Sequence, residues 1–434
     1  MELHIEKLIY GGDGLARLPA DERGRGKAVF LPFVLEGERV EAEILEEKPG
    51  FARARLQSIA EPSLHRIDPG CPYFTQCGGC HYQHSTYEHQ LEIKASILKE
   101  NLRRIAKLAL SSELQIHPSP AWNYRNRTRL QVRPLPDFGI GYYRFGSHAL
   151  LRIEQCPISS PLINRAIRAM WELGRAGKIG SSVLEIEFFA NADDSQLLIE
   201  VYLDPRRVQA DQRPCWAEAL SSALPEVTGV ALFPLAPREP APKSEPAPLA
   251  VIGKGELTYP TAQAAYRVSA GSFFQINRYL TDDLVKVVIG NLSGPTAVDL
   301  YAGVGLFSAV LSREFERVIA VESSQQSIAD LAYNVPANVK AVRATVEQYL
   351  TNVAGRVRPD LVVLDPPRGG LGERVARGVA ELGAPLLTYV SCDSATLARD
   401  LVPLLAAGYR VKQAHLVDLF PQTFHLESVL QLVR

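Results

Sequence analysis

The sequence has little of what marks membrane, secreted or disordered proteins. Its longest apolar runs, such as residues 28–35, are far shorter than the roughly 20 residues of a membrane-spanning helix. The first residues, MELHIEK, contain acidic side chains and no continuous apolar core, so we expect no secretory signal and a cytoplasmic protein. Hydrophobic residues make up 46% and charged residues 22% of the 434-residue chain, a balance typical of globular proteins. At about 150 residues per domain, this length predicts three folding units.

An excess of positive charge is also absent, because 47 Lys and Arg stand against 48 Asp and Glu. The composition therefore does not by itself indicate a nucleic-acid partner. The distribution is uneven, however: between residues 101 and 134, seven basic side chains stand against one acid, Glu113. Among them Arg125, Arg127 and Arg129 alternate, a spacing that places all three on one face of a strand. We interpret them as a candidate ridge for a phosphate backbone.

Residues 1–60 read as short strands separated by Gly and Pro, with candidate strands up to residue 10 and at 27–34, 38–45 and 52–59. Several close-set strands predict a small OB-type barrel, an architecture that often carries nucleic acid on one face. The segment GGDGLAR, followed by VFLP and GERV, resembles a TRAM domain, which is an RNA-binding module.

Residues 61–270 are predicted to form a central α+β unit. The helical period of apolar residues predicts an amphipathic helix over 87–107. Alternating apolar residues predict paired strands at 185–190 and 197–202. The stretch 237–248, PREPAPKSEPAP, is so rich in proline and charge that we expect an exposed, extended loop.

Residues 271–434 change to alternating strands and helices, which indicates an α/β unit with a doubly wound, mostly parallel sheet. In such sheets ligands bind beyond the carboxyl ends of the strands, which locates the site before any motif is considered. The candidate strands are 297–300, 318–322, 339–342, 361–365, 386–390, 410–417 and 428–433.

The first of these strands runs into the glycine-rich loop DLYAGVG at 299–305, and the second ends in the acid Glu322. Glycines let the backbone approach a ligand closely, and an acid at the second strand can accept ribose hydroxyls. A dinucleotide fold is the alternative, but it favours a third glycine where Ser308 stands. The loop resembles the S-adenosylmethionine loop of class I methyltransferases.

The fourth strand ends in DPPR at 365–368, which presents Asp365 at the sheet edge. Methyltransferases acting on exocyclic amines tend to carry Asn-Pro-Pro with an aromatic residue, so this motif favours methylation of carbon.

Cys392 follows the fifth strand and precedes a predicted helix, a position that can favour the thiolate. A thiolate adding to C6 of uracil would convert the ring to an enolate that attacks a methyl donor at C5. A base must then remove the C5 proton. The segment FPQTFHLE at 420–427 offers two candidates, His425 and Glu427.

Together these motifs resemble the RNA uracil-5-methyltransferases, which form 5-methyluridine. The resemblance is carried by FFQIN at 273–277 and by the DLYAGVG, DPPR, SCD and HLE motifs, in the family's order. It implies a class I, Rossmann-like methyltransferase fold with Cys392 as nucleophile and Glu427 as base. It also implies that S-adenosylmethionine is the cofactor and that its ligands are Gln275, Tyr301, Gly303, Glu322 and Asp365. Leu306 and Ser394 depart from the family's pattern, where Asn or Thr and Pro are common.

Six cysteines in a chain expected in the cytoplasm are not predicted to form disulfides. Cys71, Cys77 and Cys80 lie in CPYFTQCGGC, and Cys156 lies in EQCP. Four thiolates can hold a [4Fe-4S] cluster or a tetrahedral zinc ion, although zinc favours paired Cys-x2-Cys motifs and one such pair is present. The family resemblance implies the [4Fe-4S] cluster. Cys215, on a predicted helix, is expected in the core.

We therefore predict a TRAM-like barrel (1–60), a central α+β unit with an iron-sulfur cluster (61–270) and a methyltransferase unit (271–434). The predicted reaction is methylation of C5 of a uridine in 23S rRNA, because the barrel and the cysteine set together resemble the ribosomal enzymes. The same reaction on tRNA is an alternative, and so are an iron-sulfur redox protein with a nucleotide-binding unit and a pure RNA-binding module. We expect a monomer without DNA or membrane partners.

Overall fold

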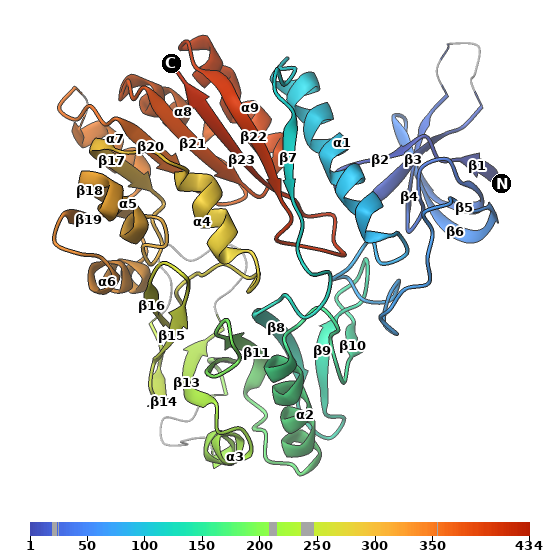
Figure 1. The fold of residues 1–434 in the computed structure, drawn as a ribbon. Helices are drawn as coiled ribbons and strands as arrows, with labels where there is room; N and C mark the ends of the chain where they lie inside the picture. Colours follow the sequence, from blue (N-terminus) through green and yellow to red (C-terminus); the bar gives the residue numbers. More distant parts are fainter. Residues whose placement is uncertain (20–23, 25, 208–214, 236–246, 354) are drawn as a thin grey trace.

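The computed structural model describes residues 1–19, 24, 26–207, 215–235, 247–353 and 355–434 (Figure 1). These described residues build three sheets of six, seven and eight strands, together with one two-stranded hairpin. The loop expected at 237–248 lies almost entirely outside the described residues. None of the helices in the described ranges combines the length and the apolar character needed to cross a membrane.

The N-terminal strands form one sheet in the order β1-β5-β6-β4-β3-β2. The sheet closes on itself through residues 2–8, because β1 pairs with β5 while β2 pairs with β3. Between these strands, Ile5 N donates to Glu38 O at 2.9 Å and Glu6 N donates to Leu15 O at 2.8 Å. The predicted barrel is thereby confirmed. Its strands are β1 (Glu2–His4), β2 (Lys7–Leu8), β3 (Asp13–Arg17), β4 (Ala28–Pro32), β5 (Arg39–Glu47) and β6 (Phe51–Glu61).

The central sheet has the order β10-β9-β8-β11-β12-β13-β14 and packs its apolar face against two helices, α2 and α3. The first helix begins at Pro161 because the Ser160 hydroxyl accepts a hydrogen bond from Ile163 N at 3.3 Å and proline suits the first helical position. Cys215 begins α3, as expected, but its side chain lies outside the described part of the chain. The elements are β8 (Arg127–Arg133), β9 (Gly139–Tyr143), β10 (Leu150–Arg152), α2 (Pro161–Arg175), β11 (Val183–Ala190), β12 (Leu197–Leu203), α3 (Cys215–Ala223), β13 (Val227–Pro234) and β14 (Ala250–Gly253).

The C-terminal sheet has the order β19-β18-β17-β20-β21-β23-β22-β7. All neighbours pair in parallel except β23, which runs antiparallel to both β21 and β22. The strands are β7 (Leu114–His117), β17 (Gly294–Leu300), β18 (Phe315–Glu322), β19 (Val339–Arg343), β20 (Leu361–Leu364), β21 (Leu386–Ser391), β22 (Arg410–Val417) and β23 (Glu427–Val433).

Helices cover both faces of this sheet, as its near-continuous apolar strands predict (Figure 1). Side chains alternate between the layers: Val298 and Leu300 pack with one layer, whereas Ala297 packs with the other. The doubly wound arrangement is therefore confirmed. One layer holds α1 (Tyr87–Ile105), α7 (Val346–Val353), α8 (Gly372–Glu381) and α9 (Ser394–Ala406), and the other holds α4 (Thr281–Ile289), α5 (Ser308–Glu314) and α6 (Gln325–Asn334).

The segment that contains α1 and β7 joins the C-terminal sheet, although the sequence analysis placed residues 61–270 in the central unit. Strand β7 pairs with β22, with Leu114 opposite Ala414, and α1 packs against α9. A four-residue strand carries no pattern that tells which sheet it joins. The hairpin of β15 (Glu256–Pro260) and β16 (Ala265–Ser269) then leads into α4.

Candidate active site and cysteine cavity

The candidate active-site side chains gather at one edge of the eight-stranded sheet. Strands β18, β17, β20 and β21 are parallel neighbours, so their carboxyl ends lie together. Glu322 ends β18, Tyr301 follows β17, Asp365 follows β20 and Cys392 follows β21. This is the edge at which open α/β sheets bind their ligands.

The reversed direction of β23 brings Glu427 beside Cys392. In the antiparallel register of β21 and β23, Ser391 lies opposite Ser428. The next pair of positions is Cys392 and Glu427, and the charge of Glu427 is one of the causes that raise the pKa of the Cys392 thiol. The structure thus places the predicted nucleophile and the predicted base next to each other.

The surroundings of Cys392 favour the protonated thiol over the thiolate. Burial, followed by the charges of Glu427 and Asp365, raises its pKa to about 12. The N–H groups at the start of α9, which the sequence predicts to favour the thiolate, have another acceptor. The helix N-terminus is already capped, because the Asp393 carboxylate accepts hydrogen bonds from Ala395 N and Thr396 N, both at 2.9 Å.

Three of the carboxyl groups at this edge, those of Asp299, Asp365 and Glu427, have raised pKa values. Burial raises the pKa of Asp299 to about 7, against a 2.5 Å hydrogen bond from the Ser308 hydroxyl. Burial and the charge of Asp299 raise the pKa of Asp365 to about 7. Burial and Asp365 raise the pKa of Glu427 well above its usual range, and the exposed Arg368 opposes this. Such an acidic, desolvated site favours a cationic ligand.

The glycine loop leaves room for a ligand. Tyr301, Gly303 and Gly305 all have left-handed φ, of 66°, 55° and 93°. A Cβ at Gly303 would meet no atom within 4 Å, whereas a Cβ at Gly305 would lie 2.7 Å from Leu331 Cδ1. Gly305 is therefore required by packing, and Gly303 faces open space.

The Glu322 carboxylate is fixed by backbone amides at the edge of this space. Its Oε2 accepts from Gly303 N at 2.8 Å, and its Oε1 accepts from Ser323 N at 2.6 Å and Ser324 N at 2.7 Å. Asp299 Oδ1, also at this edge, is buried without a hydrogen-bond partner among the described atoms. Both observations fit a site built for a polar ligand such as a ribose.

Gln275 is buried and completes the edge from the segment before α4. Its Nε2 lies 3.5 Å from Asp365 Oδ2, and its backbone carbonyl accepts from Asn126 Nδ2 at 3.1 Å. The preceding Phe274 packs in the core, which fixes the segment. All five predicted cofactor ligands therefore belong to one continuous edge.

His425, the alternative base, is weakly basic. Burial, followed by the positive charge of Arg368, lowers its pKa to about 3. Its ring packs against Phe424 with the ring centroids 4.1 Å apart. Between the two candidates, the environment favours Glu427, whose pKa is shifted upward.

Four cysteines line one cavity of about 230 Å³. The cavity lies between β8 and residues 71–80, which contain Cys71, Cys77 and Cys80 and are called the cysteine segment below. Burial, followed by the charges of Cys156 and Cys71, raises the pKa of the Cys77 thiol to about 11, so a cationic centre is needed for the thiolate form. The cavity is lined by Cys71, Cys77, Cys80 and Cys156, and Arg125 also lines it.

The sulfur atoms of these cysteines are not gathered as closely as one tetrahedral ion requires. A tetrahedral zinc ion with Zn–S bonds of about 2.3 Å holds its sulfur atoms roughly 4 Å apart. Among the described residues, the cysteines form no group of three or more whose sulfur atoms all lie within 4.8 Å of one another. The donor set, four thiols around one cavity, is of the kind that binds a [4Fe-4S] cluster.

The candidate phosphate ridge is not a free basic surface, so that prediction is wrong. Arg127 pairs with acids of β11 and β12, and Arg129 pairs with an acid of β11 and lies over the Tyr202 ring at 3.4 Å. Arg125 precedes β8 and lines the cysteine cavity. The sequence spacing shows that the three arginines alternate along a strand. It could not show which acids face them across the sheet. The acids are Glu185, Glu187 and Glu200.

Helix α1 carries polar residues that contact the loop before Glu427 and that the sequence motifs did not indicate. Lys94 is fully buried and pairs with Asp418, with 2.6 Å between Nζ and Oδ1. Lys94 lies three positions after Leu91 and four before Leu98, which is the spacing of the predicted apolar face. A charged residue at an apolar position was the signal that could have found this contact.

Comparisons with known proteins agree with this architecture. Residues 86–434 match the family described as tRNA (uracil-5-)-methyltransferase, and residues 1–56 match the TRAM domain. A protein of Aquifex aeolicus named "uncharacterized RNA methyltransferase" is 31% identical over 441 residues, covering 100% of this chain and 98% of its own. A protein with the same description from Halalkalibacterium halodurans is 31% identical over 451 residues, covering 100% and 96%.

A solved structure shares the whole fold. The Pyrococcus abyssi tRNA (uracil-54, C5)-methyltransferase in complex with S-adenosyl-L-homocysteine matches with a TM-score of 0.76 at 23% identity, covering 100% of both chains.

The fold and the acidic sheet edge define a class I methyltransferase. The chain belongs to the tRNA (uracil-5-)-methyltransferase family and carries an N-terminal TRAM domain. Membership in this methyltransferase family supports S-adenosylmethionine as the cofactor.

Proposed function

We propose that this protein methylates C5 of a uridine in 23S rRNA through a covalent adduct between Cys392 and C6 of the base. The observation that carries the proposal is the register of β21 and β23, which sets Cys392 beside Glu427. A nucleophile and a base in adjacent positions suit a reaction in which one face of a ring is attacked and a proton is then removed.

The residues divide the reaction between them. Cys392 Sγ loses its proton to solvent and forms a bond to C6, and the ring electrons move to C5. S-adenosylmethionine, when bound, would supply the electrophilic methyl group to C5 and would leave as S-adenosylhomocysteine. Glu427 then takes the proton from C5, and the C6–S bond breaks to release 5-methyluridine and the Cys392 thiolate. The target base must leave its stack to reach the sheet edge.

The cofactor would be held along the edge described above. Glu322 would accept the ribose hydroxyls, and the open side of Gly303 would let the cofactor approach the backbone. Gln275, Tyr301 and Asp365 would line the remainder. The uncompensated carboxyls favour a positively charged sulfonium over its neutral product.

Cys71, Cys77, Cys80 and Cys156 would hold a [4Fe-4S] cluster in their cavity. Four thiolates give such a cluster a net negative charge, and Arg125 supplies a positive charge in the same cavity. We assign the cluster a structural role, because the methyl transfer uses no electron from it.

A second candidate substrate is tRNA. It is supported by the full-length fold match to the Pyrococcus abyssi tRNA enzyme. The preference for 23S rRNA rests on the combination of the TRAM domain with the cysteine set.

The test is incubation with methyl-labelled S-adenosylmethionine and total RNA from cells that lack this activity, followed by separation of rRNA and tRNA. We expect labelled 5-methyluridine in the 23S fraction and none with the Cys392→Ala variant. Label in the tRNA fraction would transfer the assignment to the second candidate. Label in neither fraction, or label that survives in Cys392→Ala, would overturn the proposed reaction.

The cluster has its own test. Protein purified without oxygen should be brown and contain about four iron atoms per chain, and Cys77→Ala should lose them. A colourless protein that contains zinc instead would contradict the cluster assignment.

A further inference from the structure

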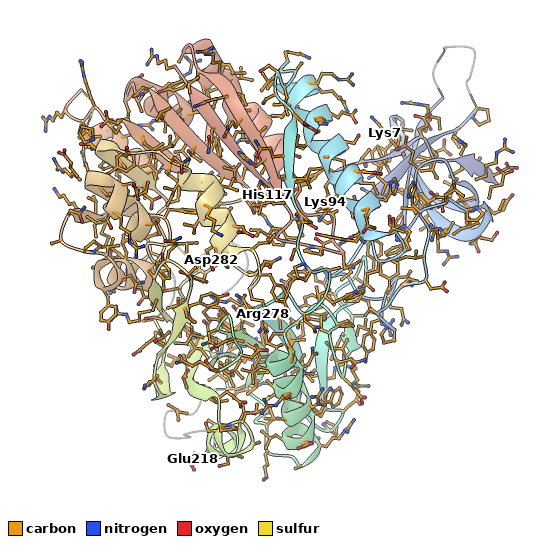
Figure 2. All side chains as sticks on the ribbon, in the orientation of Figure 1. Lys7, Lys94, His117, Glu218, Arg278 and Asp282 are labelled. Carbon is orange, nitrogen blue, oxygen red and sulfur yellow. The ribbon has the colours of Figure 1, made fainter. Side chains whose placement is uncertain are left out.

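Helix α1 presents a line of polar side chains to the loops that carry both candidate catalytic residues. Tyr87, Gln90, Lys94 and Asn101 are spaced by three, four and seven positions, so they lie on one face of the helix. We call these four residues the α1 stripe. Figure 2 shows Lys94 in the middle of the molecule.

The first part of the stripe holds the loop that leads into Glu427. Lys94 Nζ donates to Asp418 Oδ1 at 2.6 Å and to Phe420 O at 2.9 Å. Tyr87 OH donates to the other oxygen of Asp418 at 2.9 Å. Lys94 and Asp418 are both fully buried, so this ion pair cannot exchange its partners with water.

Gln90 makes a reciprocal contact in the same loop. Its Nε2 donates to Gln422 Oε1 and its Oε1 accepts from Gln422 N, both at 3.0 Å. Gln422 has a left-handed φ of 68°, a conformation that costs a non-glycine residue free energy and persists where its surroundings hold it. Glu427 follows five residues later, so these contacts fix the backbone that sets the base.

The same loop is held from the cysteine segment. His81 N and Tyr82 N, directly after Cys80, both donate to Gln422 O, at 2.9 and 3.0 Å. The α1 stripe and the cysteine segment therefore both form hydrogen bonds with Gln422.

The last part of the stripe reaches the nucleophile. Asn101 Nδ2 donates to Ser394 Oγ at 2.7 Å, and Ser394 is fully buried two positions after Cys392. Ser394 thus gives this chain a direct link between α1 and the nucleophile loop.

We propose that the α1 stripe is a positioning element with two separable effects: Gln90 and Lys94 set the base Glu427, and Asn101 sets the nucleophile Cys392. The inference rests on the proposed function, in which these two residues act in different steps. A purely structural role for α1 would affect both steps together.

The two steps can be measured separately. With RNA that contains 5-fluorouridine, Cys392 adds and the methyl group is transferred, but no C5 proton is present for the base to remove, so the adduct persists. The rate of adduct formation on a denaturing gel then reports the nucleophile step alone. Turnover with ordinary RNA reports both steps. The probe is a 23S rRNA transcript or, if the wild type does not methylate it, a tRNA transcript.

We expect Gln90→Leu to slow turnover by about 10- to 100-fold, because a misplacement of about 1 Å has an effect of that size. Its adduct formation with fluorinated RNA should stay close to the wild-type rate, and ordinary RNA should accumulate as a stalled adduct. The double variant Lys94→Met/Asp418→Asn removes the ion pair without leaving one charge buried. It should give the same two results as Gln90→Leu. Lys94→Arg keeps the positive charge, so its turnover should exceed that of the double variant.

Asn101→Ala should give the opposite of the Gln90→Leu results in the two assays. Adduct formation on fluorinated RNA should be slow, and no stalled adduct should appear on ordinary RNA. Lys99→Met, on the exposed side of the same helix, is the matched control and should match the wild type in both assays. Thermal unfolding of each variant identifies any that fail to fold.

Equal losses in both assays for folded Gln90→Leu and Asn101→Ala, or no loss in either, would overturn the positioning proposal. A wild-type protein that forms no adduct with either fluorinated transcript would overturn the proposed function instead. The two failures are therefore distinguishable.

Discussion

Two groups of buried carboxylates differ in how their charge is balanced. In the central sheet, Glu187 and Glu200 both pair with Arg127, and the exposed fractions of the two acidic side chains are 13% and 1%. At the edge of the C-terminal sheet, Asp299, Asp365 and Glu427 have raised pKa values, and the exposed Arg368 opposes this shift at Glu427.

The comparison shows that burial of an acid does not by itself indicate function. A paired acid is satisfied, and removing its partner leaves an uncompensated charge that destabilises the fold. An unpaired acid with a raised pKa is destabilising as it stands, and its presence is explained by a ligand or a reaction. The predictions below test whether the two groups separate in this way.

The largest effect is expected at Glu427. Glu427→Gln should still add and methylate, then stall with RNA attached to Cys392, so that release slows by about 10² to 10⁴-fold. A denaturing gel with labelled RNA should show a shifted band for Glu427→Gln and none for Cys392→Ala. Folded Glu200→Gln should release its product normally. A stalled adduct seen in His425→Ala rather than in Glu427→Gln would move the base role to His425.

The next effect concerns stability. Arg127→Met should lower the free energy of unfolding by about 3 to 5 kcal/mol, because it leaves the buried Glu200 without its ionic partner and leaves Glu187 only Arg129, 4.0 Å away. Asp365→Asn should not lower it, since it removes an unpaired acid. Urea unfolding of the two variants at the same pH checks this. Equal destabilisation by both would show that the two groups of acids are alike.

A smaller effect is expected in the pH dependence of stability. The folded pKa of Asp365 is about 7 and lies above the unfolded value of about 3.9, so the folded state binds more protons between these values. The free energy of unfolding therefore falls as pH rises from about 4 to about 7, by at most about 4 kcal/mol for this group. Asp365→Asn should lose this decrease in urea titrations at several pH values. Identical pH profiles for the variant and the wild type would contradict the raised pKa.

The smallest effect is expected for Arg129. Because Arg129 is paired with Glu185 and stacked on Tyr202, Arg129→Gln should leave the salt dependence of RNA binding nearly unchanged. A true phosphate contact would contribute a slope of about 0.7 to 0.9 in a plot of log affinity against log salt concentration. If Arg129→Gln decreases the slope by that amount, Arg129 contacts an RNA phosphate.

Much of the fold could be predicted because its patterns are local. The barrel strands other than β3, together with α1 and seven strands of the C-terminal sheet, follow from turn residues and from apolar runs of the right length. The site's residue types followed from motifs at strand ends, since the carboxyl ends of parallel strands share one edge.

What could not be predicted depends on partners far apart in the chain. The pairing of Arg127 with Glu187 needs the register of β8 and β11, and a wrong surface was inferred without it. The raised pKa of the Cys392 thiol depends on its burial and on the charges of Glu427 and Asp365, which only the folded sheet brings near. The buried Lys94 was visible as a charge on an apolar face, but Asp418 lies 324 positions away.

The pairing of β7 with β22 has a consequence for synthesis of the protein. Leu114 pairs with Ala414, 300 positions later, so at about 5 to 20 residues per second the partner strand leaves the ribosome roughly 15 to 60 s after β7. During that interval β7 and the apolar face of α1 have no sheet to join. The shortness of β7, which has four residues, limits the edge that another nascent chain could pair with. We therefore expect the barrel and the central sheet to fold first, and the methyltransferase sheet to close last around a strand made near the beginning.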